Sequence, residues 1–351
     1  MNLLQNITVI DFTRLLPGPL ATHMLAQMGA RVIKIESPKR MDYTRTTGKP
    51  IDGASALFHS LNHSKEIIQL DYDTEEGKDQ IFELIKNADA LIEQFRPGAM
   101  NAWGLGYEAM KEINPKLIYV SLTGYGQNGP CKKEAGHDFN YLANAGLMSL
   151  LKDDQGKPVV PGFQLGDIGG GSYLAVMAML GALLGRVNTG KGAYVDVAMT
   201  DGVLPLLSVP FSLLQSGLDH RYFNVLDGKT IVNYAVYECS DGKWLSVAAL
   251  EVKFWNNICE LVRKPEWKRE NIMELSVHVF PKKDVVELFK SKSQGEWMDL
   301  FLGEDVCIAP ILELEELEQH PHHCARGAFE DFETPNGTRL KGIALPFKLK
   351  S

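Results

Sequence analysis

The first 120 residues alternate short apolar runs with segments of helical spacing. Runs rich in β-branched residues predict strands at residues 7–11, 31–36, 67–70, 90–93 and 117–122. Residues 19–29 and 74–87 between them predict helices, the first with Pro19 in its first turn and Gly29 as its stop. Strands that alternate with helices predict a parallel sheet covered on both faces, in a Rossmann-like layout.

Beyond Asp138 the pattern changes. Residues 169–186 predict an apolar helix led by glycines, residues 194–197 a strand, and residues 201–218 a connecting helix kinked by Pro205 and Pro210. Further elements follow as strands at 234–238 and 244–248 and helices at 251–262, 282–290 and 295–301. We therefore predict an α/β fold with a Rossmann-like large domain (1–200, with 325–351 returning to it), a linker helix region (201–229) and a smaller α/β domain (230–324).

The composition narrows the class of protein. Hydrophobic residues make up 45% of the 351 and charged residues 23%, as in globular chains. The net charge of −8 is spread along the chain, which argues against a nucleic-acid binder. Five scattered cysteines predict reduced thiols, and the N-terminus lacks the basic region of a signal peptide. The uncharged stretch 168–185 approaches the length of a membrane span, but its apolar part, residues 173–184, has the length of a buried helix and is predicted to be core. We expect a cytoplasmic protein without membrane partners.

Two nucleotide-binding motifs are absent. Residues 11–19 follow the first strand but lack the G-x-G-x-x-G that brings backbone close to a pyrophosphate, which argues against NAD. Residues 185–191 read G-x-x-x-x-G-K, but Gly192 stands in place of the Ser or Thr, and the helix precedes the motif. We interpret this P-loop match as accidental.

The segment Gly136-His137-Asp138-Phe139-Asn140-Tyr141 is the first with chemical content. A lone histidine is more often a satisfied polar residue than a catalyst. Here an acid is adjacent, and a carboxylate can fix the tautomer of an imidazole or raise its basicity, as a general base requires. His137 and Asp138 are therefore candidate catalytic residues.

Asp167 is the second candidate. It stands just before Gly169-Gly170-Gly171 and the apolar helix, where backbone N–H groups and the helix dipole meet. Aspartate is also a favoured helix N-cap. The spacing alone leaves both a capping and a catalytic role open.

Several motifs carry a family resemblance. Residues 11–19 and 29–36 resemble the opening of the family III CoA-transferases, and Phe95-Arg96-Pro97-Gly98 and residues 123–130, 189–192 and 195–199 extend the likeness in the family's order. The His137-Asp138 segment resembles the α-methylacyl-CoA racemase branch, because the formyl- and carnitine-CoA transferases lack that pair. Residues 248–255 resemble a small-domain segment of the same branch, whose glutamate, here Glu251, lies at the active site.

This resemblance implies a reaction. His137 and Asp167 would flank the α-carbon of a 2-methylacyl-CoA thioester, one removing the α-proton and the other returning a proton through an enolate. Backbone N–H groups of residues 167–170 are candidate donors to the thioester oxygen. In the transferases the matching aspartate is instead a nucleophile that forms an acyl anhydride. Asp167 serves both interpretations, and His137 discriminates between them.

The resemblance also implies the ligand and the assembly. Arg96 matches a phosphate-contacting arginine, Lys65 is a weaker candidate, and Gly136 and Tyr141 belong to the expected CoA site. Coenzyme A is part of the acyl-CoA substrate, and neither a cofactor nor a metal is expected; we interpret residues 320–324 (His-Pro-His-His-Cys) as a structural loop. The family forms an obligate interlocked homodimer, in which Glu251 would come from the partner's small domain. Residues 226–231 depart from the racemase pattern, which puts the acyl pocket in question.

Overall fold

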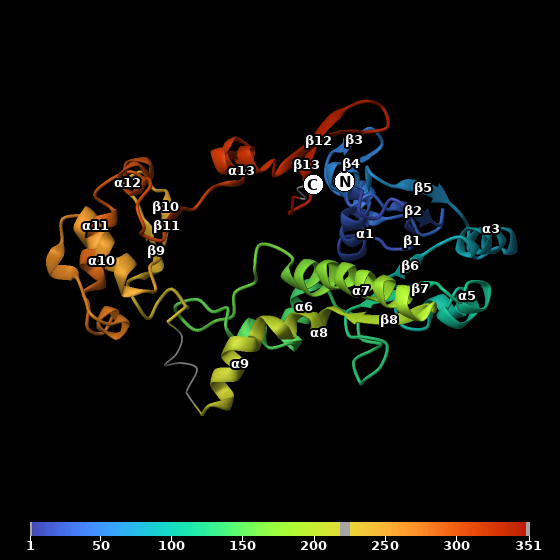
Figure 1. Ribbon diagram of the computed structural model, residues 1–351, viewed down its shortest axis with the longest axis horizontal. Helices are drawn as coiled ribbons and strands as arrows, with labels where there is room; N and C mark the ends of the chain where they lie inside the picture. The colour runs from blue at the N-terminus through green and yellow to red at the C-terminus, as the bar shows by residue number, and fades with distance from the viewer. Residues whose placement is uncertain (1, 218–224, 349–351) are drawn as a thin grey trace. The chain divides into compact units, whose positions relative to one another are not determined.

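The computed structural model describes residues 2–217 and 225–348 (Figure 1). The chain forms two compact units, the first made of Met1–Ser208 with Pro321–Ser351 and the second of Val209–His320. The sequence puts its boundaries at residues 200, 229 and 324, whereas this division assigns residues 209–229 to the second unit. The predicted end of the connecting helix at Leu218, and residues 349–351 of the returning segment, lie outside the described residues.

A six-stranded parallel sheet is the centre of the first unit. Its strands run in the order β5 (Glu66–Gln69), β2 (Arg31–Glu36), β1 (Thr8–Asp11), β6 (Ala90–Glu93), β7 (Ile118–Thr123) and β8 (Ala193–Ala198). Every neighbouring pair is parallel. Strands β1, β2 and β5 follow one another toward one edge of the sheet, and β6, β7 and β8 follow one another toward the other edge. The direction in which successive strands are added therefore reverses between β1 and β6. The predicted parallel α/β sheet is confirmed, and its order is that of a Rossmann fold.

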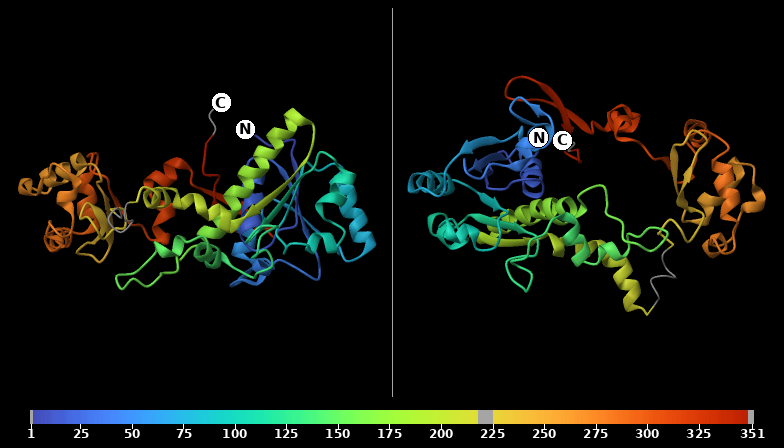
Figure 2. Two further views of the ribbon diagram at one scale, coloured as in Figure 1. Left: turned by 90° about the horizontal axis from the view of Figure 1, so that it is seen from below. Right: turned by 180° about the vertical axis from the view of Figure 1, so that it is seen from behind.

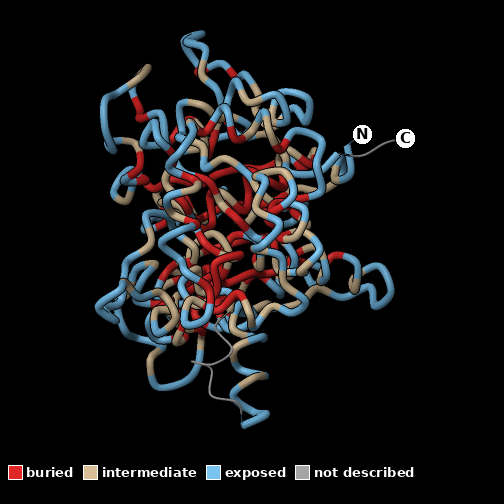
Figure 3. The backbone as a smooth tube through the Cα atoms, turned by 90° about the vertical axis from the view of Figure 1, so that its left-hand side faces the viewer, coloured by how far each residue is buried: buried red, intermediate tan, exposed pale blue. Residues whose placement is uncertain are grey.

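Alternation along the strands builds two cores. Val9 and Ile92 point to the face covered by α1 (Pro17–Gln27) and α7 (Tyr173–Thr189). Ile10 and Leu91 point to the opposite face, covered by α3 (Glu75–Lys86), α4 (Ala99–Ala102) and α5 (Tyr107–Ile113). Figure 2 shows the two helical layers on opposite sides of the sheet, and the strands belong to the buried stretches drawn red in Figure 3. Burial on both faces explains why these strands read as continuous apolar runs.

The apolar helix after Asp167 differs from its prediction. Its first part, Gly166–Ser172, is π-helical, and α7 follows from Tyr173. Ala175, Met179 and Leu183 are buried against the sheet, but Met177, Leu184 and Val187 are exposed, so the stripe predicted as core is buried on one face only. Among the described residues, Gly166–Thr189 is the stretch with a length and composition that could cross a membrane, a test that core helices also pass.

The remaining elements of the first unit surround the sheet. The predicted connecting helix is α8 (Met199–Val203), a 3₁₀ turn at Leu204–Leu207 that contains Pro205, and α9 (Ser208–Gln215), which runs into the second unit. The sequence analysis missed α2 (Ala56–Asn62), α4, α5 and α6 (Asp138–Asn144), together with two short hairpins. These hairpins are β3 (Pro50–Ile51) with β4 (Ala54–Ser55), and β12 (Phe329–Glu333) with β13 (Arg339–Ile343). The interpretation of residues 320–324 as a loop is wrong for residues 321–324, which belong to the helix α13 (Pro321–Arg326).

The second unit has its own core. Strands β9 (Tyr234–Glu238) and β10 (Trp244–Ala248) form the predicted hairpin, and β11 (Ile308–Pro310) adds an antiparallel third strand. Helices α10 (Val252–Leu261), α11 (Lys282–Phe289) and α12 (Gln294–Phe301) match the predicted ones. Trp255, Phe289 and Trp297 form the centre of this core, which is independent of the first unit's sheet.

Candidate active site

A cavity of about 450 Å³ opens at the carboxyl edge of the parallel sheet. Its walls come from the segments that follow β1, β6, β7 and β8: Leu15 and Pro17, Gln94 to Pro97, Thr123 to Tyr125, and Met199. The sheet order reverses between β1 and β6, and ligands of open α/β sheets bind at such a switch point. Residues 134–137, Asn140, Tyr141 and Asp167 complete the wall. The topology therefore brings the two candidate bases, His137 and Asp167, to one cavity.

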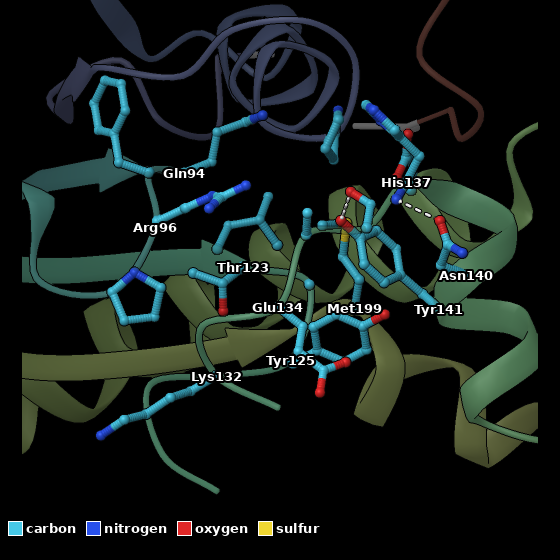
Figure 4. Close-up of a pocket in the computed structure, with 18 of the residues that line it drawn as sticks. Gln94, Arg96, Thr123, Tyr125, Lys132, Glu134, His137, Asn140, Tyr141 and Met199 are labelled. Carbon is cyan, nitrogen blue, oxygen red and sulfur yellow. Dashed lines mark hydrogen bonds between the residues drawn. The ribbon is translucent and has the colours of Figure 1, made fainter. Parts of the chain in front are cut away.

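The loop before α6 positions His137. The backbone N–H of His137 donates to Asn140 Oδ1 (3.1 Å), and Tyr141 Oη donates to the Gly136 carbonyl (2.5 Å; Figure 4). A Cβ on Gly136 would lie 2.7 Å from Tyr141 Cε1, so only glycine fits there. His137 itself is exposed at the start of α6. These contacts hold the histidine backbone while leaving the imidazole at the cavity.

The π-helical segment positions Asp167. Its N-terminal cap is Leu165, so the interpretation of Asp167 as a helix cap is wrong. The segment packs backbone against backbone on α8: a Cβ on Gly170 would lie 2.5 Å from the Met199 carbonyl oxygen, and one on Gly202 2.2 Å from the Gly170 oxygen. The glycines therefore serve close packing, and π-helical turns are frequent at functional sites.

Asp138 acts on Asp167 rather than on His137. Its Oδ1 accepts a hydrogen bond from the Asp167 N–H at 2.8 Å, in place of the contact with imidazole that the sequence suggests. Burial, together with the negative charge of Asp138, raises the pKa of Asp167 to about 7. Asp167 is thus poised to exchange a proton near neutral pH.

The N–H groups predicted to hold the thioester oxygen are partly engaged. The Asp167 N–H bonds Asp138, and the Ile168 N–H bonds the Gln164 carbonyl (3.0 Å). Asn140, to which the sequence analysis assigned no role, offers an alternative. Because its Oδ1 accepts the His137 N–H, its Nδ2 is left as a donor on the cavity wall. The signal in the sequence that could have identified Asn140 is its position three residues after His137.

The expected CoA contacts divide into two groups. Arg96 is exposed, lines the cavity and reaches in from the side opposite His137 (Figure 4); Gly136 and Tyr141 also line it. The lining does not include Lys65, whose buried Nζ bonds the Pro19 carbonyl (2.9 Å), Asn62 Oδ1 (2.9 Å) and Asp11 Oδ2 (3.2 Å). These contacts indicate a structural role for Lys65, which the spacing of residues in the sequence does not reveal. Lys132, which we did not single out, is a second cation on the wall.

Glu251 belongs to the second unit. It precedes α10 in an extended conformation, and its side chain is exposed. A place for Glu251 in a shared site stays a prediction.

All five cysteines are free thiols.

Comparison with known proteins identifies the family of this chain. The α-methylacyl-CoA racemase of Homo sapiens is 33% identical over 93% of this chain and 82% of its own length. The human succinyl-CoA:glutarate CoA-transferase is 32% identical over 95% and 77%. The crystal structure of a CAIB/BAIF family protein from Brucella suis superposes with a TM-score of 0.83 at 30% identity, covering 98% of this chain and 91% of that one. The family model of CoA-transferase family III matches residues 4–351, and the chain belongs to this family.

Proposed function

We propose that this protein racemises 2-methylacyl-CoA thioesters by removing and returning the α-proton. The observation that carries the proposal is that His137 and Asp167 line one cavity, with the pKa of Asp167 raised to about 7. For either enantiomer, racemisation needs one group in its base form and the other in its acid form. An imidazole and a carboxyl whose pKa is raised to about 7 supply two groups of different type, each of which can act as acid or as base.

The family relationship alone supports an acyl-CoA enzyme of either kind, because racemases and transferases are among the relatives at similar identity. The alternative is an acyl-CoA:carboxylate CoA-transferase with Asp167 as nucleophile. His137 on the cavity wall favours racemisation, since a transferase needs no second base there. Arg96 supports binding of the CoA phosphates, and Asn140 Nδ2 would hold the enolate oxygen.

The test is to incubate the protein with one enantiomer of a 2-methylacyl-CoA in deuterated water. Racemisation predicts that deuterium enters at the α-carbon while optical purity is lost. A transferase would instead move CoA onto an added free carboxylate, and hydroxylamine would trap an acyl group on Asp167. Trapping of that acyl group without α-deuterium exchange would refute the racemase proposal.

We also propose that the active form is an obligate interlocked homodimer completed by Glu251 of the second copy. Exposed apolar side chains support a partner surface, namely Met177, Leu184 and Val187 on α7 and Val209, Phe211 and Leu214 on α9. Co-expressed His137→Ala and Glu251→Ala chains should recover activity, whereas mixing the two purified variants should not. An active monomer by sedimentation would refute the dimer. A cytoplasmic location stays a prediction.

A further inference from the structure

Three metal-ligating side chains meet away from the catalytic cavity. His23 lies on α1, His63 directly follows α2, and Glu330 lies on β12 in the C-terminal segment of the same unit. One potential ligand atom from each residue lies within 4.8 Å of the others. His63 Nε2 is 3.6 Å from Glu330 Oε1, and the two imidazole centroids are 4.8 Å apart. None of the three lines the catalytic cavity.

Neighbouring groups orient both imidazoles. His63 Nδ1 lies 3.2 Å from the His59 carbonyl oxygen, which only accepts, so Nδ1 carries the proton and the Nε2 lone pair is left for a ligand. His23 Nδ1 bonds Ser64 Oγ at 2.9 Å, which leaves Nε2. A second hydrogen bond of this kind is the usual way in which a metal-ligating histidine is held in place.

A neighbouring side chain also holds the carboxylate of Glu330 in place. Gln27 Nε2, one turn along α1 from His23, donates to Glu330 Oε1 at 2.7 Å. The Phe332 ring stacks on His63 at 3.9 Å and covers one side of the group. His23 is 4% exposed, whereas the Glu330 side chain is 35% exposed and that of His63 12%, so an ion and a water molecule could enter from the Glu330 side.

We propose that His23, His63 and Glu330 bind one zinc ion, which ties the C-terminal hairpin β12–β13 to α1 and α2. Two imidazoles and one carboxylate are a donor set typical of Zn²⁺, with water in the fourth position. Zn–N and Zn–O bonds of about 2.0–2.2 Å place tetrahedral ligand atoms roughly 3.3–3.6 Å apart. Only small side-chain rotations separate the present arrangement from that geometry.

This ion would have a structural role. Figure 1 shows β12 and β13 beside the N-terminal strands β3 and β4, so the hairpin joins segments from the two ends of the chain. The proposal departs from the sequence-based expectation of no metal, because the spacing of these three residues forms no motif.

The test uses full-length protein stripped of metal by a chelator and then titrated with Zn²⁺, with Co²⁺ as a spectroscopic probe. We expect one ion per chain, a rise in melting temperature of about 3–8 °C at saturating zinc, and tetrahedral Co²⁺ absorption. Zinc should also slow amide hydrogen exchange in residues 329–343. The absence of saturable binding would overturn the proposal.

Matched variants locate the ion. Glu330→Gln keeps the side-chain shape, and His63→Phe keeps the stacking on Phe332; each should weaken zinc binding at least tenfold and abolish the protection of residues 329–343. Glu333→Gln, an exposed change on the same strand, should bind zinc like the wild type. Zinc binding that survives in both ligand variants, or that is lost in His322→Ala on α13, would overturn the assignment.

Discussion

Two aspartates near the carboxyl edge of one sheet, Asp11 buried and Asp167 half-buried, have opposite chemistry. Asp11 ends β1, and its carboxylate accepts hydrogen bonds from Thr13, Thr22 and Lys65. Burial raises its pKa, but Lys65, Lys34 and the two hydroxyls together lower it below the usual value. Asp167 has the carboxylate of Asp138 as its charged neighbour, so burial and repulsion both raise its pKa, to about 7. Burial raises the pKa of both carboxyls, and the sign of the neighbouring charges decides which of them stays an anion and which can carry a proton.

A second buried ion pair, between Lys34 and Asp42, supports one wall of the cavity. Lys34 Nζ donates to the Thr13 carbonyl at 2.6 Å and pairs with Asp42 at 3.3 Å, and Asp42 Oδ1 accepts the Leu15 N–H at 3.0 Å. Leu15 has a φ of 64°, a conformation that a branched side chain rarely adopts, and it lines the cavity. The ion pairs thus hold the strained loop that forms one wall of the site.

Removing the carboxyl of Asp167 should have the largest effect on activity. Asp167→Asn should lower α-proton exchange about 10²–10⁴-fold, because the amide cannot carry the proton. His137→Ala should cause a similar loss. Thermal melting should change little in either variant, since neither side chain is part of a core. Near-wild-type exchange in His137→Ala would remove it from the mechanism and favour the transferase alternative.

Removing Lys65, the ion-pair partner of Asp11, should instead lower the stability of the fold. Lys65→Met should lower the free energy of unfolding by about 3–5 kcal/mol, because it leaves Asp11 buried with one cation fewer. Lys86→Met, at an exposed pair with Glu83, is the control and should change it by less than about 0.5 kcal/mol. Urea unfolding measures both. An unchanged stability with a higher KM for acyl-CoA would restore Lys65 as a CoA contact.

Arg96 tests whether the cavity cation acts on the substrate or on Asp167. Arg96→Ala should raise the KM for acyl-CoA about 10–100-fold, the value of one or two charge-assisted hydrogen bonds, with a smaller change in kcat. The pH midpoint of exchange should stay near the wild-type value. A shift of that midpoint to higher pH would show that Arg96 stabilises the Asp167 carboxylate.

The smallest effect should come from Asp138→Asn, which can still accept the Asp167 N–H. Loss of the like charge should lower the pKa of Asp167 from about 7. For the enantiomer from which Asp167 takes the proton, exchange should rise with pH through that pKa, and for the opposite enantiomer it should fall. Both profiles should therefore shift to lower pH in the variant. Unshifted profiles would mean that Asp138 does not tune Asp167.

Local pattern determined much of the fold. The predicted strands 31–36, 90–93, 234–238 and 244–248 coincide with β2, β6, β9 and β10, because apolar runs bounded by turn residues are a property of the chain itself. His137, Asp167 and Arg96, chosen from continuous motifs and from the family resemblance, all line the cavity, and their roles stay predictions. Helix α6 and hairpin β12–β13 were missed, since their stability depends on packing against distant segments.

Tertiary structure decided what each charged group does. The glycines after Asp167 read as a capped helix start, yet the segment is π-helical and Gly170 packs closely on Gly202. Lys65 was a candidate phosphate contact in the sequence, yet in the structure it pairs with the buried Asp11. His23, His63 and Glu330 become neighbours only once the C-terminal hairpin returns to α1. Electrostatic interaction falls off with distance in space rather than along the chain, so residue types and elements could be inferred from the sequence, but the partner of each charge could not.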